Sequence, residues 1–519
     1  MSVRYGFVID HRRCIGCHAC TVACKEENRV PLGAFRTWVK YVEKGAFPDT
    51  RRYFSVLRCN HCDDAPCVAI CPTVALYRRA DGIVDFDGER CIGCKSCMQG
   101  CPYDALYIDP ATNTAAKCHY CAHRVEVGLE PACVIVCPEQ AIIAGDLDDP
   151  RTPIARLVAR EQVQVRKPEQ GTRPKVYYVG ADASALAPSL QRPQASFVFG
   201  QRPAAERDLI QMVADVQAQA RGGDGAVSRT VYDAPHAPRP WGWRVAAYLW
   251  TKSIAAGALM TAAMTVPLER AGHAGGQAWL GWGAPLLALV FLAITTALLV
   301  LDLKRPDRFL YVLFKANPRS WLARGAWILI AYGLVAALWL TGGLGGGGVP
   351  TVVILLGLLL GAATAGYSAF LFGQAEGRDF WQSPLLLPHL LVAALLAGAA
   401  SLIVLAAVIT GDAAAGAILD APLLGFLVLH GVLLFSELGV THANLDVARA
   451  AALVTRGPWR RAFWAGVVVA GVLAPFALIV AADALDLWPL RLAAAALALA
   501  GLWIWEDIWV KAGQSIPLS

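Results

Sequence analysis

The chain has 519 residues and a formal net charge of +6, and its length predicts more than one domain. Hydrophobic residues make up 56% of it, but residues 1–240 carry ordinary charge and many prolines, whereas residues 241–519 are built mainly from Ala, Leu, Val and Gly. Lys and Arg form no runs with interleaved aromatic residues, which excludes nucleic acid as an expected partner. We therefore expect a water-soluble domain followed by a membrane domain.

The first part of the chain contains all sixteen cysteines, which lie between Cys14 and Cys137. They fall into four groups of four, and the first and third groups have strict C-x2-C-x2-C-x3-C spacing. The second group lengthens one gap, and the fourth carries a longer insert in its middle. The groups are Cys14, Cys17, Cys20 and Cys24; Cys59, Cys62, Cys67 and Cys71; Cys91, Cys94, Cys97 and Cys101; and Cys118, Cys121, Cys133 and Cys137.

The spacing within a group has a chemical explanation. Three thiolates two residues apart can hold three corners of one iron–sulfur cubane, while the fourth, three residues on, reaches a neighbouring cubane. Pro72, Pro102 and Pro138 follow the last cysteine of three groups, where a helix can begin, and Lys25 takes that place in the first group. Disulfides do not explain this rhythm, and zinc sites usually pair two C-x2-C halves. The sequence therefore predicts four [4Fe–4S] clusters in two ferredoxin-like pairs.

Short strands are expected around the cysteine groups. Residues 4–10 alternate enough for a strand, and residues 74–77 and 83–86 flank the turn Asp81-Gly82. Residues 103–108 and 141–144 repeat the pattern, and residues 150–180 form a tail that ends in the strand-like PKVYYVG. The hydrophobic core of such a domain is small, so the bound clusters would stabilise its fold by cross-linking the chain. We expect an α+β double ferredoxin-like domain over residues 1–180.

Residues 181–240 are rich in Ala, Pro, Gln, Arg and Gly and are expected to form a linker, with one short helix near residues 204–219. Residues 241–519 contain eight stretches of about twenty mostly apolar residues, each long enough to cross a bilayer. The expected spans are 244–267, 279–301, 325–346, 350–373, 384–410, 422–440, 462–482 and 489–510. They predict an all-α bundle of eight transmembrane helices, with the linker and the C-terminus on one side.

The loops between the expected spans differ in charge. The linker side carries most of the basic residues, namely Arg244, Lys304, Arg305, Arg308, Lys315, Arg319, Arg324, Arg378, Arg449, Arg456, Arg460, Arg461 and Lys511. The far side has only Arg270 and Arg491. By the positive-inside rule, the linker side and the cysteine-rich domain are expected in the cytoplasm, with the bundle in a bacterial inner membrane. No export leader precedes the first cysteine group, which agrees with this expectation.

The four cysteine groups resemble those of the four-cluster electron-transfer subunits of molybdopterin oxidoreductases, over residues 1–180. In that family the outer groups pair with each other, as do the inner ones. The resemblance implies four clusters, held by Cys14, Cys17, Cys20 and Cys137; by Cys118, Cys121, Cys133 and Cys24; by Cys59, Cys62, Cys67 and Cys101; and by Cys91, Cys94, Cys97 and Cys71. It also implies a separate catalytic subunit that carries a molybdenum or tungsten bis-pterin.

The membrane half resembles the eight-span NrfD/PsrC type of quinone-interacting subunit. The resemblance rests on DLKRPDRF at residues 302–309, Asn317-Pro318, Gly325-Ala326-Trp327, Tyr367 and the closing KAGQSIPLS. In relatives this subunit is often a separate chain, whereas here it would be fused to the cluster domain. Several relatives hold their cluster subunit outside the cytoplasm, on the side opposite to the one that the loop charges predict.

Polar groups within the expected spans mark a candidate quinone site, because ionisable residues are costly in a bilayer. Most lie toward the linker end, where a quinone needs hydrogen-bond donors and a source or sink of protons. The candidates are Lys252, Asp302, Tyr367, His389, Glu437 and His442. A structural interpretation is equally open, in which Asp302 pairs with Arg305 in a loop and the two histidines cap helix ends. His430, nearer mid-span, would relay protons or bond a carbonyl.

Together these features predict a subunit of a quinone-linked respiratory oxidoreductase that does not itself hold the catalytic centre. Its partners would be a molybdopterin catalytic subunit, the membrane quinone pool and lipid, and its cofactors four [4Fe–4S] clusters. A cytoplasmic cluster domain favours sulfite or another sulfur compound as the substrate of the partner. Two alternatives stay open: a module of a larger quinone-linked respiratory complex without a pterin enzyme, and a redox-sensing membrane protein.

Overall fold

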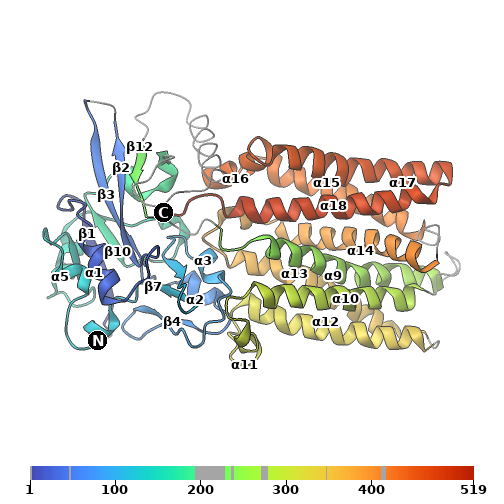
Figure 1. Ribbon diagram of the computed structural model, residues 1–519, viewed down its shortest axis with the longest axis horizontal. Helices are drawn as coiled ribbons and strands as arrows, with labels where there is room; N and C mark the ends of the chain where they lie inside the picture. Colours follow the sequence, from blue (N-terminus) through green and yellow to red (C-terminus); the bar gives the residue numbers. More distant parts are fainter. Residues whose placement is uncertain are drawn as a thin grey trace.

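A computed structural model of the chain describes residues 3–45, 48–192, 228–234, 239–270, 279–345, 348–410 and 417–519. Figure 1 shows an elongated molecule with strands and short helices at one end and a bundle of long helices at the other. The N-terminus lies in the strand-rich half, and the C-terminus returns from the bundle to that half, where Lys40 donates to the carbonyl oxygen of Ser519. The architecture therefore changes where the composition of the sequence changes.

The central sheet of the strand-rich half has the strand order β8-β1-β10-β9. Its strands are β1 (Tyr5–Asp10), β8 (Ile142–Asp146), β9 (Val163–Gln164) and β10 (Val176–Val179). β1 pairs antiparallel with β8 and parallel with β10, and its Phe7, Val8 and Ile9 are fully buried. The helix α6 (Pro153–Arg160) packs on β1 and β8. The strands expected at residues 4–10, at 141–144 and in PKVYYVG are confirmed.

A second sheet, in the order β11-β12-β2-β3, contains a long hairpin that the sequence pattern did not reveal. Its strands are β2 (Thr37–Lys44), β3 (Arg51–Arg58), β11 (Gln191–Arg192) and β12 (Ser228–Tyr232). β12 pairs antiparallel with β2, so that Thr230 lies opposite Val42. Part of the segment expected as a linker thus belongs to this sheet, because the alternating SRTVY suits a strand. The helix expected near residues 204–219 lies outside the described residues.

Short hairpins and short helices surround the cysteines. The hairpins are β4 (Leu76–Arg78) with β5 (Val84–Phe86) and β6 (Leu106–Ile108) with β7 (Ala115–Lys117). The helices are α1 (Ala19–Glu27), α2 (Pro66–Ile70), α3 (Ser96–Gly100), α4 (Ala122–Val125), α5 (Ala132–Ile135) and, later in the chain, η1 (Pro168–Gln170), α7 (Ala183–Leu186) and η2 (Pro188–Leu190). Gly16 and Gly93 stand in the first and third cysteine loops with φ of 71° and 68°, a conformation that favours glycine.

The second half is a bundle of long helices with short helices in its loops (Figure 1). The long helices are α9 (Trp243–Arg270), α10 (Leu280–Asp302), α12 (Trp321–Leu344), α13 (Thr351–Gly373), α14 (Leu386–Thr410), α15 (Asp420–Gly439), η6 (Ala462–Leu473) continued by α17 (Ala474–Leu485), and α18 (Trp488–Gly513). The short ones are η3 (Pro306–Arg308), α11 (Tyr311–Phe314), η4 (Asp379–Trp381) and α16 (Leu445–Thr455).

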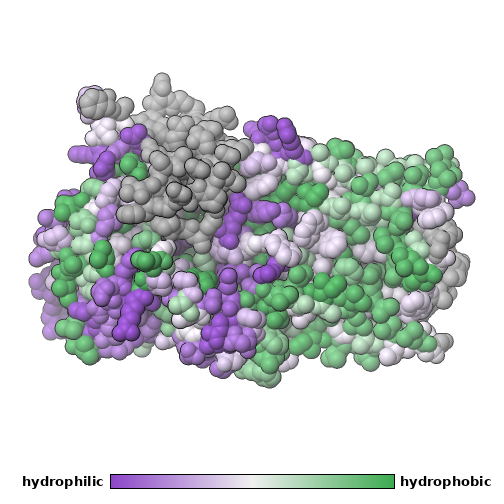
Figure 2. Space-filling view, in the orientation of Figure 1, coloured by the Kyte–Doolittle hydropathy of each residue, from purple (hydrophilic) through white to green (hydrophobic). Residues whose placement is uncertain are grey.

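Within the described residues, seven helices are long and apolar enough to cross a bilayer, with mean hydropathy from 1.4 to 2.7. They are α10, α12, α13, α14, α15, α18 and the continuous pair of η6 and α17. Hydrophobic residues dominate the visible surface of the bundle, whereas the strand-rich half is largely hydrophilic (Figure 2). The chain is therefore a multi-pass membrane protein with seven candidate spans, where the sequence predicted eight.

The helix that is missing from this count is α9, which has 28 residues. Its Thr251, Lys252 and Ser253 lower its hydropathy, and they are buried in the protein. α9 packs against α14 at backbone contact, because a Cβ on Gly257 would lie 1.7 Å from the carbonyl oxygen of Ala394. α9 is thus a central helix of the bundle that faces protein along much of its length.

Candidate functional site

Cysteines from the first and fourth sequence groups meet in one cavity. Cys14, Cys17 and Cys20 come from the loop and first turn of α1, and Cys137 follows α5; together they line the cavity and are called quartet one. The N–H of Ala141 donates to the Sγ of Cys137 at 3.2 Å. α1 and α5 lie far from the bundle in Figure 1, so quartet one is at the outer end of the molecule.

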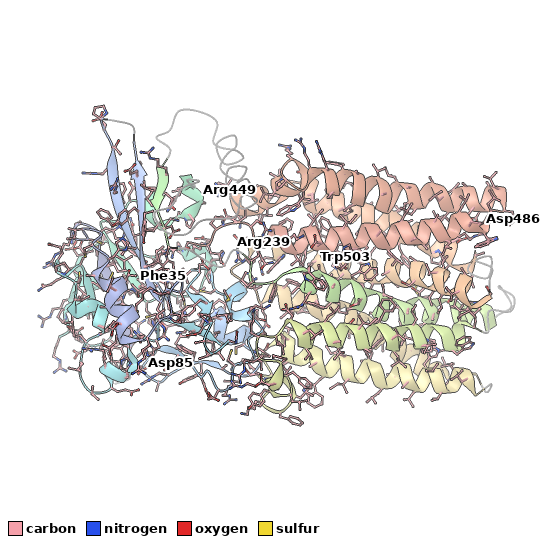
Figure 3. All side chains as sticks on the ribbon, viewed as in Figure 1. Phe35, Asp85, Arg239, Arg449, Asp486 and Trp503 are labelled. Atoms are coloured by element: carbon pink, nitrogen blue, oxygen red, sulfur yellow. The ribbon has the colours of Figure 1, made fainter. Side chains whose placement is uncertain are left out.

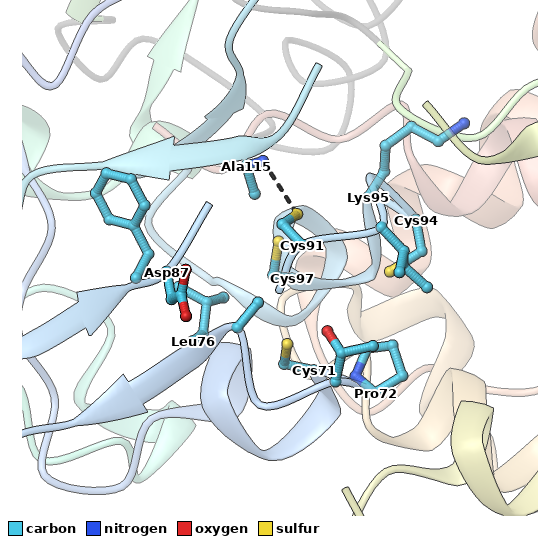
Figure 4. A pocket seen from close by; sticks show the side chains of 13 residues that line it. Cys71, Pro72, Leu76, Asp87, Cys91, Cys94, Lys95, Cys97 and Ala115 are labelled. Atoms are coloured by element: carbon cyan, nitrogen blue, oxygen red, sulfur yellow. Dashed lines mark hydrogen bonds between the residues drawn. The ribbon is translucent and has the colours of Figure 1, made fainter. Parts of the chain in front are cut away.

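Quartet four consists of Cys71, Cys91, Cys94 and Cys97, which line a second cavity next to the bundle (Figure 4). The sulfur atoms of Cys71, Cys91 and Cys97 face a common space in this view. The N–H groups of Gly93 and Ala115 donate to the Sγ of Cys91 at 3.4 and 3.3 Å. Such N–H donors stabilise the negative charge of thiolate ligands.

Quartet two joins Cys24 to Cys118, Cys121 and Cys133 of the fourth sequence group. Burial, followed by the charges of Cys133 and Cys121, raises the pKa of Cys24 to about 11. Burial likewise raises the pKa of Cys118, and Cys24 adds to the effect. The Nδ2 of Asn28 lies 3.7 Å from the Sγ of Cys24 and 3.8 Å from the Sγ of Cys121, so thiols of the two sequence groups lie side by side.

Quartet three joins Cys59, Cys62 and Cys67 of the second sequence group to Cys101 of the third. Burial, followed by the charges of Cys101 and Cys59, raises the pKa of Cys67 well above its usual value. The N–H of His61 approaches the Sγ of Cys59 at 3.5 Å. The structure therefore brings together the same four sets of cysteines that the family resemblance implies.

The donor sets fit iron–sulfur clusters better than the alternatives. None of the sixteen cysteines, all of which are described, forms a disulfide. Over the described ranges, no three His, Cys, Asp or Glu side chains are close enough to hold a single metal ion. Quartets one and four each line a cavity, and gathering four thiolates is unfavourable without a positively charged core. A [4Fe–4S] core suits both the spacing and the charge.

The four quartets form a row through the strand-rich half. Neighbouring quartets contain pairs of thiols that are close enough to influence each other by charge, namely Cys20 and Cys133, Cys118 and Cys59, and Cys97 and Cys67. The order from the outer end is therefore one, two, three, four. Quartet four ends the row at the helix bundle.

The loop after α10 holds quartet four against the bundle. The N–H groups of Lys304 and Arg305 donate to the carbonyl oxygens of Gly93 and Ile92, both at 3.2 Å. A Cβ on Gly93 would lie 2.5 Å from the Cβ of Lys304, so this contact requires glycine in the cysteine loop. The DLKRPDRF stretch that carried the resemblance is thus part of the junction between the halves.

Two further side chains of the membrane half bond the main chain of quartet four. Asn317 donates from Nδ2 to the carbonyl oxygen of Cys71 at 2.8 Å. Trp241 donates from Nε1 to the carbonyl oxygen of Cys94 at 3.1 Å, and its ring stacks on Trp381 with centroids 5.5 Å apart. Figure 3 shows the dense packing of side chains at this junction, where Arg449 also lies.

Asp302 belongs to this junction. Its carboxylate accepts a hydrogen bond from the Nζ of Lys95 at 2.8 Å, and the two side chains are 17% and 8% exposed. Arg305 pairs with Asp307 at 2.8 Å. The suggested pair of Asp302 with Arg305 is therefore wrong, because Lys95, beside Cys94, takes the place of Arg305.

A polar group lies inside the bundle below the junction, and we call it the Lys252 group. Lys252 donates from Nζ to the Oγ of Ser368 at 2.7 Å and lies 5.1 Å from the ring centre of Tyr367. Tyr248 and Glu506 complete the group through their electrostatic interactions with Tyr367 and Lys252. The sequence prediction named Lys252 and Tyr367 but missed the other three; the acidic Glu506 within an apolar stretch was the available signal.

A second polar group, the His389 group, joins α14 and α15. The Nδ1 of His389 lies 2.9 Å from the Oε2 of Glu437, and its Nε2 lies 3.1 Å from the Nδ1 of His430. Trp505 stacks on the His389 ring with centroids 5.6 Å apart. Both ring nitrogens of His389 face side chains of α15 and not the main chain of a helix end, so the suggestion that His389 caps a helix end is wrong. His442, in contrast, is half-buried in the loop after α15 and is not among the contacts of this group.

The far end of the bundle holds a separate ion-pair cluster. Arg491 pairs with Asp420 at 2.6 Å and with Asp483 at 2.7 Å. Asp486 lies at the same end, remote from the strands (Figure 3). Arg491, the basic side chain described at this far end, is thus neutralised by Asp420 and Asp483.

Comparison with known proteins agrees with this geometry. Residues 50–147 match the family model of the 4Fe-4S dicluster domain, and residues 234–516 match that of polysulphide reductase, NrfD. The B component of tetrathionate reductase from Salmonella typhimurium is 47% identical over 37% of this chain and 78% of its own length. The B component of polysulfide reductase from Wolinella succinogenes is 41% identical over 34% of this chain and 95% of its own length. The arsenate respiratory reductase iron-sulfur subunit ArrB of a Shewanella species is 34% identical over 34% of this chain and 96% of its own length.

These relatives match about a third of the chain, the 4Fe-4S model lies within the strand-rich half, and the NrfD model covers more than half of the chain. The structure divides the chain in the same way. One half holds sixteen cysteines in four quartets, and the other is a bundle with seven candidate spans. The chain therefore belongs to the polysulphide reductase NrfD family, and it carries an iron–sulfur electron-transfer domain of the type found in tetrathionate and polysulfide reductases, fused to that membrane anchor.

Proposed function

We propose that this chain conducts electrons between a molybdopterin catalytic subunit and membrane quinone. The observation that carries the proposal is the unbroken row of four thiol quartets, which begins at the outer end of the molecule and ends at the bundle. Each quartet would hold one [4Fe–4S] cluster, which when bound accepts and passes on one electron at a time. The protein would hold the clusters in order and shield them from water.

The Lys252 group would form the quinone site. It lies inside the bundle beneath quartet four and offers hydrogen-bond donors at Lys252, Tyr367 and Tyr248 to the carbonyl oxygens of a quinone. Glu506 has one carboxylate oxygen without a hydrogen-bond partner among the described residues, so it can exchange a proton as the quinone changes redox state. Asp302 stays outside this site, since its carboxylate is engaged by Lys95.

The His389 group would carry protons for the same reaction. Its three side chains are linked end to end from Glu437 through His389 to His430 and are buried. Glu437 retains one oxygen without a partner among the described residues, at the end of the group nearest the strand-rich half. Buried ionisable side chains that bond one another in a membrane domain are typical of proton relays. His442 would take no part, because it lies outside the group.

α9 would be the eighth span, and the strand-rich half would lie on the cytoplasmic side. α9 is long enough to cross a bilayer and lies side by side with α10 and α14. Basic side chains that are exposed or half-buried remain on the junction side, at Lys315, Arg319, Arg324, Arg456, Arg460 and Arg461. The far side has, among the described residues, Arg491, which two aspartates neutralise. This asymmetry supports the cytoplasmic assignment.

The quinone site is tested with Lys252→Met and Tyr367→Phe in the purified complex. Each change removes a hydrogen bond to the quinone, so the rate of electron exchange between quinol and the clusters should fall about 10- to 100-fold. The four clusters, measured by iron content and electron paramagnetic resonance, should be retained. Tyr332→Phe is the matched control, because Tyr332 is a buried tyrosine of the same bundle that bonds the carbonyl of Ala255. Normal exchange rates in both variants would remove the Lys252 group from the quinone site.

A further inference from the structure

Arg58 is a buried cation placed among the thiols. It is the last residue of β3, and only 1% of its surface is exposed. Its NH1 donates to the Sγ of Cys133 at 3.1 Å, and its guanidinium lies 4.5 Å from the ring centre of Phe7. The side chain is thus fixed at one position beside a thiol of quartet two.

Arg58 has no acidic partner among the described residues, and its Nε and NH2 have no hydrogen-bond partner there. Arg166 and Lys117, also buried in this half, bond main-chain carbonyl oxygens and not sulfur. Three other buried bases have acidic partners. Lys175 pairs with Asp63 at 3.0 Å, Lys40 with Asp233 at 3.4 Å and Lys95 with Asp302 at 2.8 Å. A buried unpaired charge costs several kcal/mol (roughly 3–5 when a partner is removed), so Arg58 needs a negative counter-charge nearby.

The thiols of two quartets supply that counter-charge. The positive charge of Arg58 acts on Cys133 and Cys118 of quartet two and on Cys20 of quartet one. Arg58 therefore lies between quartets one and two, nearest to quartet two.

We propose that Arg58 raises the reduction potentials of the two clusters farthest from the membrane, most strongly that of quartet two. Reduction adds one negative charge to a cluster, and a fixed positive charge in a poorly polarisable interior stabilises the reduced form. The hydrogen bond from NH1 to Cys133 acts in the same direction. The inference rests on the proposed assignment of four clusters. Arg58 would give the clusters of quartets one and two a greater affinity for electrons than they would have without its charge.

The test is a redox titration of the purified holo-complex, followed by electron paramagnetic resonance. Arg58→Met removes the charge and should lower the equilibrium constant for reduction of the quartet two cluster at least tenfold, which is about 59 mV for one electron. The quartet one cluster should shift less, and the clusters of quartets three and four should not shift. Arg58→Lys keeps the charge and should stay close to the wild-type potentials.

Arg166→Met is the matched control. Arg166 is also 1% exposed in this half, but it donates to the carbonyl oxygens of Leu186 and Leu518 and not to sulfur. Its substitution should leave the four potentials unchanged. An equal shift in the Arg166 variant would overturn the proposal, because any buried cation would then have the same effect.

Iron analysis separates this inference from the assignment of four clusters. Fewer than four clusters in the wild-type protein would refute that assignment, whatever Arg58 does. Fully loaded Arg58→Met protein with unchanged potentials would overturn the role of Arg58. Loss of iron in Arg58→Met with retention in Arg58→Lys would support the role, since the charge alone would then decide cluster binding. Equal loss of iron in both variants would overturn it and leave Arg58 a packing residue.

Discussion

At the scale of single residues, the junction shows how a charge can be mistaken for a ligand-binding group. Asp302 ends α10 within an apolar stretch, and such a position favours a functional role. In the folded chain its partner is Lys95, which is 207 residues away in the sequence. The two side chains are largely buried, so the pair joins the cysteine loop of quartet four to the membrane half.

Breaking this pair should be costly. Asp302→Asn or Lys95→Met leaves one buried charge without its partner and should destabilise the contact between the halves by about 3–5 kcal/mol. The double variant Lys95→Met with Asp302→Leu should recover most of the loss, because no unpaired charge remains. Thermal unfolding in detergent measures the coupling as a double-mutant cycle.

Quinone turnover of the same double variant checks the placement of Asp302. We expect turnover to recover together with stability, because Asp302 acts by holding the junction. A double variant that is stable but does not exchange electrons with quinone would return Asp302 to the quinone site.

At the scale of elements, the bundle shows why hydropathy alone undercounts helices. α9 contacts α10, α13, α14 and α18, so its polar residues face protein and not lipid. Lys252 on α9 bonds Ser368 on α13, and Ser253 lies 3.5 Å from Glu506 on α18. A central helix can therefore carry the polar groups of a site while the helices around it supply the apolar surface.

The orientation of these elements can be measured with inserted protease sites. One site goes into the basic loop at residues 456–461, on the junction side, and the other goes next to Asp486, on the far side. Protease added to intact spheroplasts should cut only at Asp486, because the basic loop is expected in the cytoplasm. Both sites should be cut after permeabilisation, and cutting of intact spheroplasts at the basic loop alone would place the strand-rich half outside.

At the scale of the whole molecule, the row of quartets is exposed to solvent at quartet one, the end away from the bundle. Cys17 of quartet one is exposed, and apolar side chains next to its cysteines are exposed as well, including Ile15 at 55% and Ile135 at 57%. An exposed apolar surface beside a redox centre is typical of a docking face. We expect the catalytic subunit to bind there, at the end of the molecule that is farthest from the membrane.

Metal analysis of the native complex tests this arrangement. We expect molybdenum or tungsten to co-purify with iron, and Ile135→Glu should lower the ratio of molybdenum or tungsten to iron by weakening the docking face. The exposed Val352→Ser on α13 serves as the control, because it lies in the bundle, away from this face. A stable native complex that holds iron but neither molybdenum nor tungsten would favour the alternative of a respiratory module without a pterin enzyme.

The sequence by itself determined the chemistry of the first half and the class of the second. Cysteine spacing is a local property of the chain, so the four groups could be recognised and interpreted without the fold, and apolar stretches of about twenty residues are likewise local. Only the tertiary structure decided which distant side chains meet. Lys95 with Asp302, Lys252 with Ser368, His389 with Glu437 and Arg58 with Cys133 are pairs between separate elements, and no period or spacing along the chain encodes them.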